Sequence, residues 1–236
     1  AAAAMSPAEV ATVRQFAADG GIVIADLLTA TYDQHGCPYD KSPACDLFGL
    51  QNTGALNRQP ATITGLDAEA EGLTLKNLSM TVPAWESGLI AKTAKPLAEI
   101  AADGQKHHVA FVNPIGKGCA VYFGAAIMTT IGDWQEMRYT SANAPQFKII
   151  SQLLDVLFKR AGIVPVATTD LKATSIQVRQ NGPLRILGLV RDYKQAANLD
   201  PGVTPRTVNL DREYHVYDLL EGGYLGFHKT FTHPFA

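Results

Sequence analysis

The sequence has almost no excess of charge of either sign. Its 20 Lys and Arg residues nearly balance its 22 Asp and Glu residues, and the formal net charge is −2. A chain with this balance lacks the basic surface that binds nucleic acid or an anionic membrane. It also lacks a long hydrophobic run, because stretches such as GGIVIADLL end far short of the roughly 18 apolar residues of a membrane-spanning helix. We therefore expect a soluble protein with neither nucleic acid nor a membrane as a partner.

Cysteine is scarce as well. Cys37, Cys45 and Cys119 form no CxxC pair and no zinc-binding spacing, and the adjacent His107 and His108 would point to opposite faces of one strand. We therefore expect no metal and no cofactor. Cys37 and Cys45 share one loop, so an oxidising compartment could join them, although the small, odd number of cysteines favours free thiols.

A capped helix followed by a buried strand is predicted at the N-terminus. Ser6 and Glu9 have the spacing of a capping box, and Pro7 suits the first helical position. Gly20 is expected to end this helix in a left-handed conformation. The apolar run Ile22–Ala25 follows directly and has no polar alternation. Such a run is typical of a strand covered on both faces, so we expect Ile22–Ala25 to lie inside a mainly parallel sheet.

The rest of the chain indicates two domains. Short apolar runs separated by Asp103-Gly104 and by Gly116-Lys117-Gly118 indicate antiparallel hairpins. A second amphipathic helix is expected over residues 147–158, and the remainder of the chain shows only strands and turns. We therefore expect an α/β domain over residues 1–168, incomplete at its N-terminus. An antiparallel β-sandwich portion, incomplete at its C-terminus, should follow over residues 169–236.

The loop after the first predicted strand contains the polar residues that look most like a site. Tyr32, Asp33 and His35 lie where α/β sheets place ligands, beyond the carboxyl end of a strand. Trp134, in a later polar loop, can stack on a sugar or contact a neighbouring subunit. These four residues are our ligand or interface candidates, and we expect no catalytic residue and no metal ligand. The alternatives are a turn-forming role for Asp33 and burial of Trp134 under its own loop.

Two enzyme signatures are incomplete in this sequence. A phosphate-binding loop around Lys117 would need a glycine in place of Phe111 and a serine or threonine in place of Gly118. A nucleophilic cysteine would need a sharp strand-to-helix turn and a nearby histidine, and neither Cys45 nor Cys119 has that context. An amidotransferase-like cysteine hydrolase stays open as one alternative function. A carbohydrate-binding module that uses the loop candidates is the other.

Several short motifs occur in an order that resembles the trimerisation domain of β-galactosidases. The run from Ser6 to Ile24 is similar to the capped helix, double glycine and strand of that family. Later segments resemble its hairpin, its closing helix and the β-sandwich that follows in these hydrolases. They are Asp103-Gly104, Gly116-Lys117-Gly118, Ala120–Phe123, Ala161–Pro165 and residues 208–226.

This resemblance implies a flavodoxin-like or amidotransferase-like three-layer α/β domain with a parallel sheet, followed by the β-sandwich portion. In the family a separate α/β barrel carries the two catalytic glutamates, and the trimerisation domain lacks the amidotransferase nucleophile. The expected function is therefore that of a non-catalytic accessory and oligomerisation region of a β-galactosidase-like glycoside hydrolase. Its expected partners are other copies of the chain, as in a trimer, and a catalytic barrel that this chain does not contain.

Overall fold

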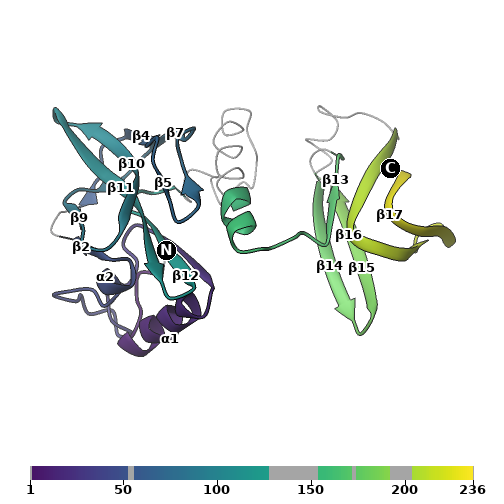
Figure 1. Ribbon diagram of the computed structural model, residues 1–236, viewed down its shortest axis with the longest axis horizontal. Helices are drawn as coiled ribbons and strands as arrows, with labels where there is room; N and C mark the ends of the chain where they lie inside the picture. The colour runs from purple at the N-terminus through teal and green to yellow at the C-terminus, as the bar shows by residue number, and fades with distance from the viewer. Residues whose placement is uncertain (1, 53–55, 128–153, 172–173, 192–203, 236) are drawn as a thin grey trace. The chain divides into compact units, whose positions relative to one another are not determined.

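The computed structural model divides the chain into two compact units (Figure 1). It describes residues 2–52, 56–127, 154–171, 174–191 and 204–235. Unit 1 runs from Ala1 to Gly162, and unit 2 runs from Ile163 to Ala236. The boundary expected after residue 168 falls inside the first strand of unit 2, which pairs with a later strand of that unit. No helix in the described part of the chain is long and apolar enough to cross a membrane.

Unit 1 begins with a capped helix and is otherwise built mainly of strands. In chain order its named elements are α1 (Pro7–Ala18), β1 (Ile22–Asp26), α2 (Ala44–Leu47), β2 (Leu50–Asn52), β3 (Leu56–Asn57), β4 (Ala61–Gly65), β5 (Glu69–Ala70), β6 (Leu73–Thr74), β7 (Ser79–Val82), β8 (Trp85–Glu86), β9 (Leu89–Ala91), β10 (Lys95–Ala102), β11 (Gln105–Ile115) and β12 (Gly118–Phe123). The predicted capping box is confirmed. The backbone N–H of Glu9 donates to Ser6 Oγ (3.2 Å), and the backbone N–H of Ser6 donates to Glu9 Oε2 (2.7 Å).

The centre of unit 1 is a six-stranded sheet in the order β1-β12-β11-β10-β4-β7. The β1–β12 pair is parallel, with Ile22 opposite Cys119, and the other described pairs of this sheet are antiparallel. The two predicted hairpin turns are confirmed, since Asp103-Gly104 joins β10 to β11 and Gly116-Lys117 joins β11 to β12. Among the described pairs of this sheet, the β1–β12 pair joins the residues that lie farthest apart in the sequence.

The expected flavodoxin-like or amidotransferase-like three-layer domain with a parallel sheet is wrong. Of the described residues, 54% are in strands and 12% are in helices. The main sheet is mixed, and several two-stranded antiparallel sheets accompany it. Parallel neighbours need a long crossover connection, usually a helix. Strands β10, β11 and β12 instead follow one another through tight turns, so they become antiparallel neighbours.

Strand β1 lies at an edge of the sheet, which contradicts the interior position expected for it, and Ile24 is 44% exposed. Its apolar run still has a physical reason, because the sheet carries a hydrophobic cluster on each face. Ile22 packs against the cluster that contains Val121, and Val23 packs against the cluster that contains Val10 of α1. The apolar run therefore reflects the burial of both faces of the strand, and a strand at the edge of a sheet can also have both faces covered.

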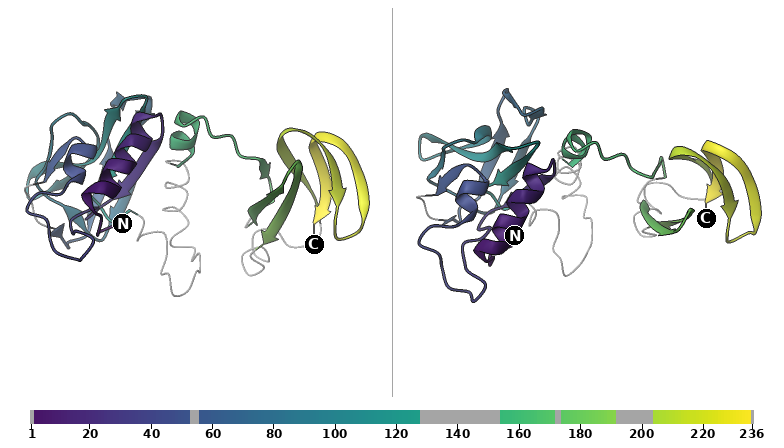
Figure 2. Two further views of the ribbon diagram at one scale, coloured as in Figure 1. Left: turned by 90° about the horizontal axis from the view of Figure 1, so that it is seen from below. Right: turned by 60° about the horizontal axis from the view of Figure 1, so that its bottom comes forward.

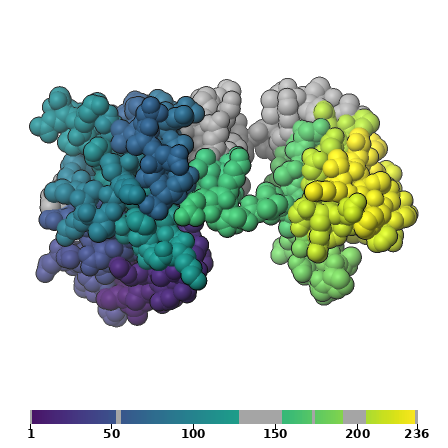
Figure 3. All heavy atoms as spheres, viewed as in Figure 1, coloured from purple at the N-terminus to yellow at the C-terminus, as the bar shows by residue number. Residues whose placement is uncertain are grey.

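Helix α1 lies along one face of the sheet and forms part of the outer surface of unit 1 (Figures 2 and 3). Its end meets the turn between β11 and β12, where the backbone N–H of Lys117 donates to the carbonyl oxygen of Ala18 (3.0 Å). A Cβ added at Gly118 would lie 2.1 Å from the carbonyl oxygen of Gly21. Glycine at position 118 therefore lets the hairpin and the helix end approach each other.

The second predicted helix is described over residues 154–160, and residues 147–153 of the prediction lie outside the described residues. Leu157 is 2% exposed and belongs to the same hydrophobic cluster as Trp85, with Leu154 packed against it. Phe158 is 41% exposed. In the described residues the buried stripe of this helix is therefore narrower than the apolar pattern predicts.

The described residues of unit 2 form two antiparallel sheets. Its strands are β13 (Ala167–Thr169), β14 (Thr174–Asn181), β15 (Leu184–Arg191), β16 (Thr204–Asp218) and β17 (Gly223–Phe235). Strands β13, β16 and β17 form one sheet, and β14 and β15 form the other. Buried Val208 and Leu210 of the first sheet form a small cluster with Ile176 and Leu189 of the second. Asp218, at the turn end of the β16–β17 hairpin, has its Oδ2 2.9 Å from Nε2 of His233, which pairs with Arg206 near the other end.

Candidate functional site

The loop that follows β1 is organised by Asp33. Its Oδ1 accepts hydrogen bonds from the backbone N–H groups of His35 and Cys37, both at 2.8 Å. The bond from Cys37, helped by His35, holds the pKa of Asp33 below its ordinary value of 3.8. This is the turn-forming role that the sequence left open as the alternative for Asp33.

The other sequence candidates do not gather around one cavity. Tyr32 is 41% exposed and takes part in backbone pairing with Ala4 and Pro38. His35 is exposed, and its backbone supports the Asp33 turn. Trp134 lies outside the described residues. The structure thus brings Tyr32, Asp33 and His35 together only as neighbours in one loop.

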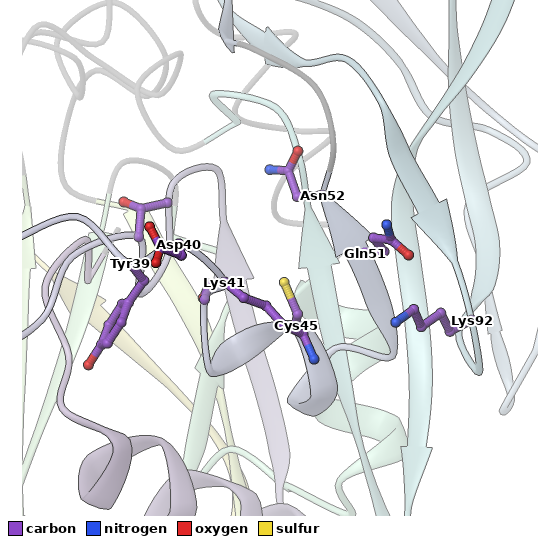
Figure 4. A pocket seen from close by; sticks show the side chains of 9 residues that line it. Tyr39, Asp40, Lys41, Cys45, Gln51, Asn52 and Lys92 are labelled. Atoms are coloured by element: carbon purple, nitrogen blue, oxygen red, sulfur yellow. The ribbon is translucent and has the colours of Figure 1, made fainter.

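A surface cavity of about 500 Å³ lies beside this loop in unit 1 (Figure 4). Figure 4 shows Tyr39, Asp40 and Lys41 on one side of it and Gln51 and Lys92 on the other, with Cys45 of α2 between them. Most of the lining side chains are polar, and they come from the loop after β1, from α2, and from β2 and the segment after β9.

A narrow second cavity of about 30 Å³ adjoins the first and leads to Glu86. The two cavities share Thr31, Ser42, Cys45 and Asn52. The walls of the narrow part are largely apolar and include Phe48, Leu50 and Leu89. A polar opening therefore adjoins a much smaller, largely apolar cavity, here called the neck, whose lining includes the buried carboxyl group of Glu86.

Glu86 is 2% exposed and is held by three hydrogen-bond donors. Tyr122 Oη donates to Oε2 (2.5 Å), while the backbone N–H of Leu28 and Asn52 Nδ2 donate to Oε1 (both 3.3 Å). Burial raises the pKa of Glu86 above its ordinary value of 4.5, the three donors oppose that rise, and the nearby carboxyl group of Asp26 adds to it. Burial also raises the pKa of Tyr122, as does the neighbouring Glu86. Tyr122 is therefore a neutral hydrogen-bond donor throughout the ordinary pH range.

The inner end of the cavity lies where the parallel strands β1 and β12 finish. Leu28 (φ 62°) and Ala30 (φ 52°), directly after β1, both have left-handed backbone conformations although neither is glycine. The backbone N–H of Glu86 donates to the carbonyl oxygen of Gly124, directly after β12 (2.7 Å). Strained backbone is retained where the surroundings fix it, and it gathers at functional sites.

The cavity does not have the composition of a cysteine hydrolase site. Cys45 lines both cavities, but none of the six histidines of the chain, all of which are described, lines either of them. Cys45 also lies on the four-residue helix α2, preceded by Pro43, and so lacks a strand-to-helix turn. The groups present can bind and orient a ligand, but the histidine that usually activates a thiol nucleophile is missing from the lining.

Sequence reasoning missed Glu86, Asn52 and Tyr122. Each belongs to a different strand, and no local motif links them. The one sequence feature that could have pointed to Glu86 is its position as a single acidic residue beside Trp85 in a largely uncharged stretch. That feature is weak, because a single acidic residue in such a stretch is equally compatible with a solvent-exposed side chain. Glu86, Asn52 and Tyr122 come together only in the folded chain, in which β8 and β12 are paired with their neighbouring strands.

No protein-family model matches the sequence, and no curated protein matches it either. Solved structures do match. A β-galactosidase from Bacillus circulans sp. alkalophilus aligns over 99% of this chain and 30% of its own, with a TM-score of 0.70 and 17% identity. A cold-adapted β-galactosidase from Rahnella sp. R3 aligns over 99% and 30%, with a TM-score of 0.67 and 16% identity.

A GH42 β-galactosidase from G. stearothermophilus, solved as a catalytic mutant, aligns over 98% of this chain and 30% of its own, with a TM-score of 0.66 and 15% identity. At these identities the likeness concerns the fold. The described chain has the fold of one region of these β-galactosidases. It spans about a third of their length or less, because each alignment covers 30% of the relative.

Proposed function

We propose that this chain is a non-catalytic accessory and oligomerisation region of a β-galactosidase-like glycoside hydrolase. The observation that carries the proposal is the extent of the structural likeness, which reaches 99% of the chain and includes strands of both units. A chance likeness of one common motif would cover much less. The specific role of a trimerisation domain, inferred from the sequence motifs, belongs to this proposal.

The arrangement of acidic residues supports a non-catalytic role. Hydrolysis of a glycoside generally requires two carboxyl groups roughly 5–10 Å apart across the scissile bond. Asp40 is the acidic residue that lines the wide cavity, and Glu86 is the one that lines the narrow neck. Both oxygens of Glu86 are already engaged by Tyr122, Leu28 and Asn52. In the described residues this cavity therefore favours binding over hydrolysis.

Exposed apolar side chains support an assembling role. Tyr217, Leu219, Tyr224 and Phe227 lie near the end of the β16–β17 hairpin, and each is more than half exposed. Large apolar groups gathered on a surface usually mark a contact with another protein. We infer that the proposed partners are further copies of the chain and the catalytic barrel.

The test combines a rate assay with a mass measurement. Purified chain incubated with a nitrophenyl β-galactoside should release nitrophenol only at the buffer rate, while light scattering should give the mass of an oligomer. Turnover that survives repurification and disappears in the Glu86→Gln variant would contradict the non-catalytic role. A monomer at all accessible concentrations would contradict the oligomerisation role.

A further inference from the structure

The cavity of unit 1 has the dimensions of a small-molecule site. Its volume of about 500 Å³ falls within the roughly 300–1,000 Å³ typical of such sites. It joins a polar opening to a neck that ends at Glu86, and it adjoins the strained residues Leu28 and Ala30. The accessory role proposed above does not require a ligand in this cavity.

The lining of the opening mixes hydrogen-bond donors with acceptors. Lys41 and Lys92 donate and Asp40 accepts, whereas Gln51 and Asn52 can do both. The hydroxyl groups of Thr31 and Ser42 can also do both. A phosphate would bring a negative charge close to Asp40, and an ammonium group would bring a positive charge close to Lys41 and Lys92. A ligand with several neutral hydroxyl groups, each of which donates and accepts, fits this mixed lining best.

The neck can receive one such hydroxyl group. Its apolar walls, which include Phe48 and Leu89, match the CH₂ part of a hydroxymethyl group, and Glu86 lies at the inner end. A carboxylate offers roughly four acceptor positions, and Glu86 uses three of them for Tyr122, Leu28 and Asn52. One acceptor position thus remains for a donor from the ligand.

We propose that this cavity is a saccharide-binding site, which holds a neutral mono- or disaccharide without cleaving it. The mixed polar opening binds the ring hydroxyl groups, and the apolar neck takes a hydroxymethyl group whose O–H donates to Glu86. The proposal stands on the lining of unit 1 alone and does not require the chain to assemble with a barrel.

Cys45 provides a direct test, because its side chain lines the cavity whereas Cys37 is exposed and lines neither cavity, and Cys119 is buried. In a Cys37→Ser variant of the full chain, maleimide labelling of Cys45 should slow in a saturable manner when galactose or lactose is added. In the matched Cys45→Ser variant, labelling of Cys37 should not change. Inorganic phosphate and methylammonium, tested separately, should leave both rates unchanged.

Calorimetry on the unmodified chain gives an independent measurement. Galactose or lactose should bind with a saturable heat, and Gln51→Ala should weaken binding by about tenfold, the size expected for one lost hydrogen bond. Gln59→Ala, which removes an exposed glutamine outside both cavities, should leave the affinity unchanged.

The proposal would be overturned if phosphate or methylammonium, and not the sugars, protected Cys45 from labelling. It would also be overturned if the sugars neither protected Cys45 nor gave a heat of binding. An equal loss of affinity in Gln51→Ala and Gln59→Ala would overturn it too, because the sugar would then bind elsewhere. Neither measurement involves hydrolysis or assembly. Failure of this proposal is therefore distinguishable from failure of the accessory role.

Discussion

The hydroxyl group of Tyr122 on β12 donates a 2.5 Å hydrogen bond to Oε2 of Glu86 on β8, and both residues are buried. Tyr122, the backbone N–H of Leu28 and the side-chain amide of Asn52 are the donors to this carboxyl group, and none of them carries a positive charge. Such donors offset only part of the cost of burying a negative charge. Because burial raises the pKa of Glu86, the folded state binds a proton at this position more tightly than the unfolded chain does.

The first prediction follows from the sign of that shift. The stabilising contribution of Glu86 is complete below its ordinary pKa of 4.5 and is lost as the pH rises through the higher pKa of the folded state. Glu86→Gln removes this dependence. The free energy of unfolding of the variant should therefore rise relative to that of the natural chain as the pH increases above 4.5. Urea unfolding at a series of pH values measures the difference.

Glu69→Gln, at an exposed position, is the control for this series and should show no such trend. If the difference between the natural chain and Glu86→Gln stays constant with pH, Glu86 has the same pKa in the folded and unfolded states.

The second prediction concerns the contact between α1 and the β11–β12 turn. Gly118→Ala should destabilise unit 1 by about 1–3 kcal/mol, the usual cost of forcing an extra methyl group into packed structure. Gly223→Ala is the matched control, because nothing lies within 4 Å of the added Cβ there. It should change the stability by less than about 0.5 kcal/mol. Equal melting temperatures for the two variants would show that the helix end can move aside.

The third prediction compares the stability cost of truncating two adjacent residues of the helical segment 154–160. Leu157→Ala should cost about 2–5 kcal/mol, because its side chain is 2% exposed and packs in the larger cluster of unit 1. Phe158→Ala removes a larger side chain that is 41% exposed, and it should cost much less. The midpoints of denaturant unfolding give the two costs when both variants unfold with the same slope. A larger cost for Phe158→Ala than for Leu157→Ala would contradict the buried face assigned to this helix.

The fourth prediction concerns the loop after β1. Asp33→Ala removes the acceptor for the backbone N–H groups of His35 and Cys37, so the loop should open and maleimide labelling of Cys37 should accelerate. Asp33→Asn retains a side-chain oxygen and should label at nearly the natural rate. Equal labelling rates for the two variants would show that the side chain of Asp33 does not hold this loop.

Local features of the fold could be predicted from the sequence, because their causes are local. The capping box of Ser6 and Glu9 depends on side chains three residues apart. The turn at Asp103-Gly104 depends on residues that tolerate positive φ values, which are 52° and 72° here. The sheet topology depends on which distant strands pair, and the apolar run Ile22–Ala25 is compatible with either an interior or an edge position. That ambiguity led to the wrong expectation of a strand inside a parallel sheet, and the three-layer α/β domain implied by the family resemblance is wrong for the same reason.

The candidate site could not be predicted for a related reason. Asp33 stands out in the sequence because turn-forming and ligand-binding acids occupy the same kind of loop. Glu86 does not stand out, since its role depends on Tyr122 and Asn52, which approach it from other strands. A site built from single residues of several strands leaves no spaced motif.

The parallel pairing of β1 with β12 also sets an order of events during synthesis. Residue 22 pairs with residue 119, so the ribosome must release most of unit 1 before β1 has a partner strand. Closing so long a loop costs chain entropy that is recovered only when the two strands meet. Helix α1 shares a hydrophobic cluster with Phe111, Ala120 and Tyr122, so part of the apolar surface that covers the helix is also missing until then. The first residues of unit 1 to be made are therefore among the last to reach their native positions, and a nascent chain that ends before β12 should leave its N-terminal helix open to chaperones and proteases.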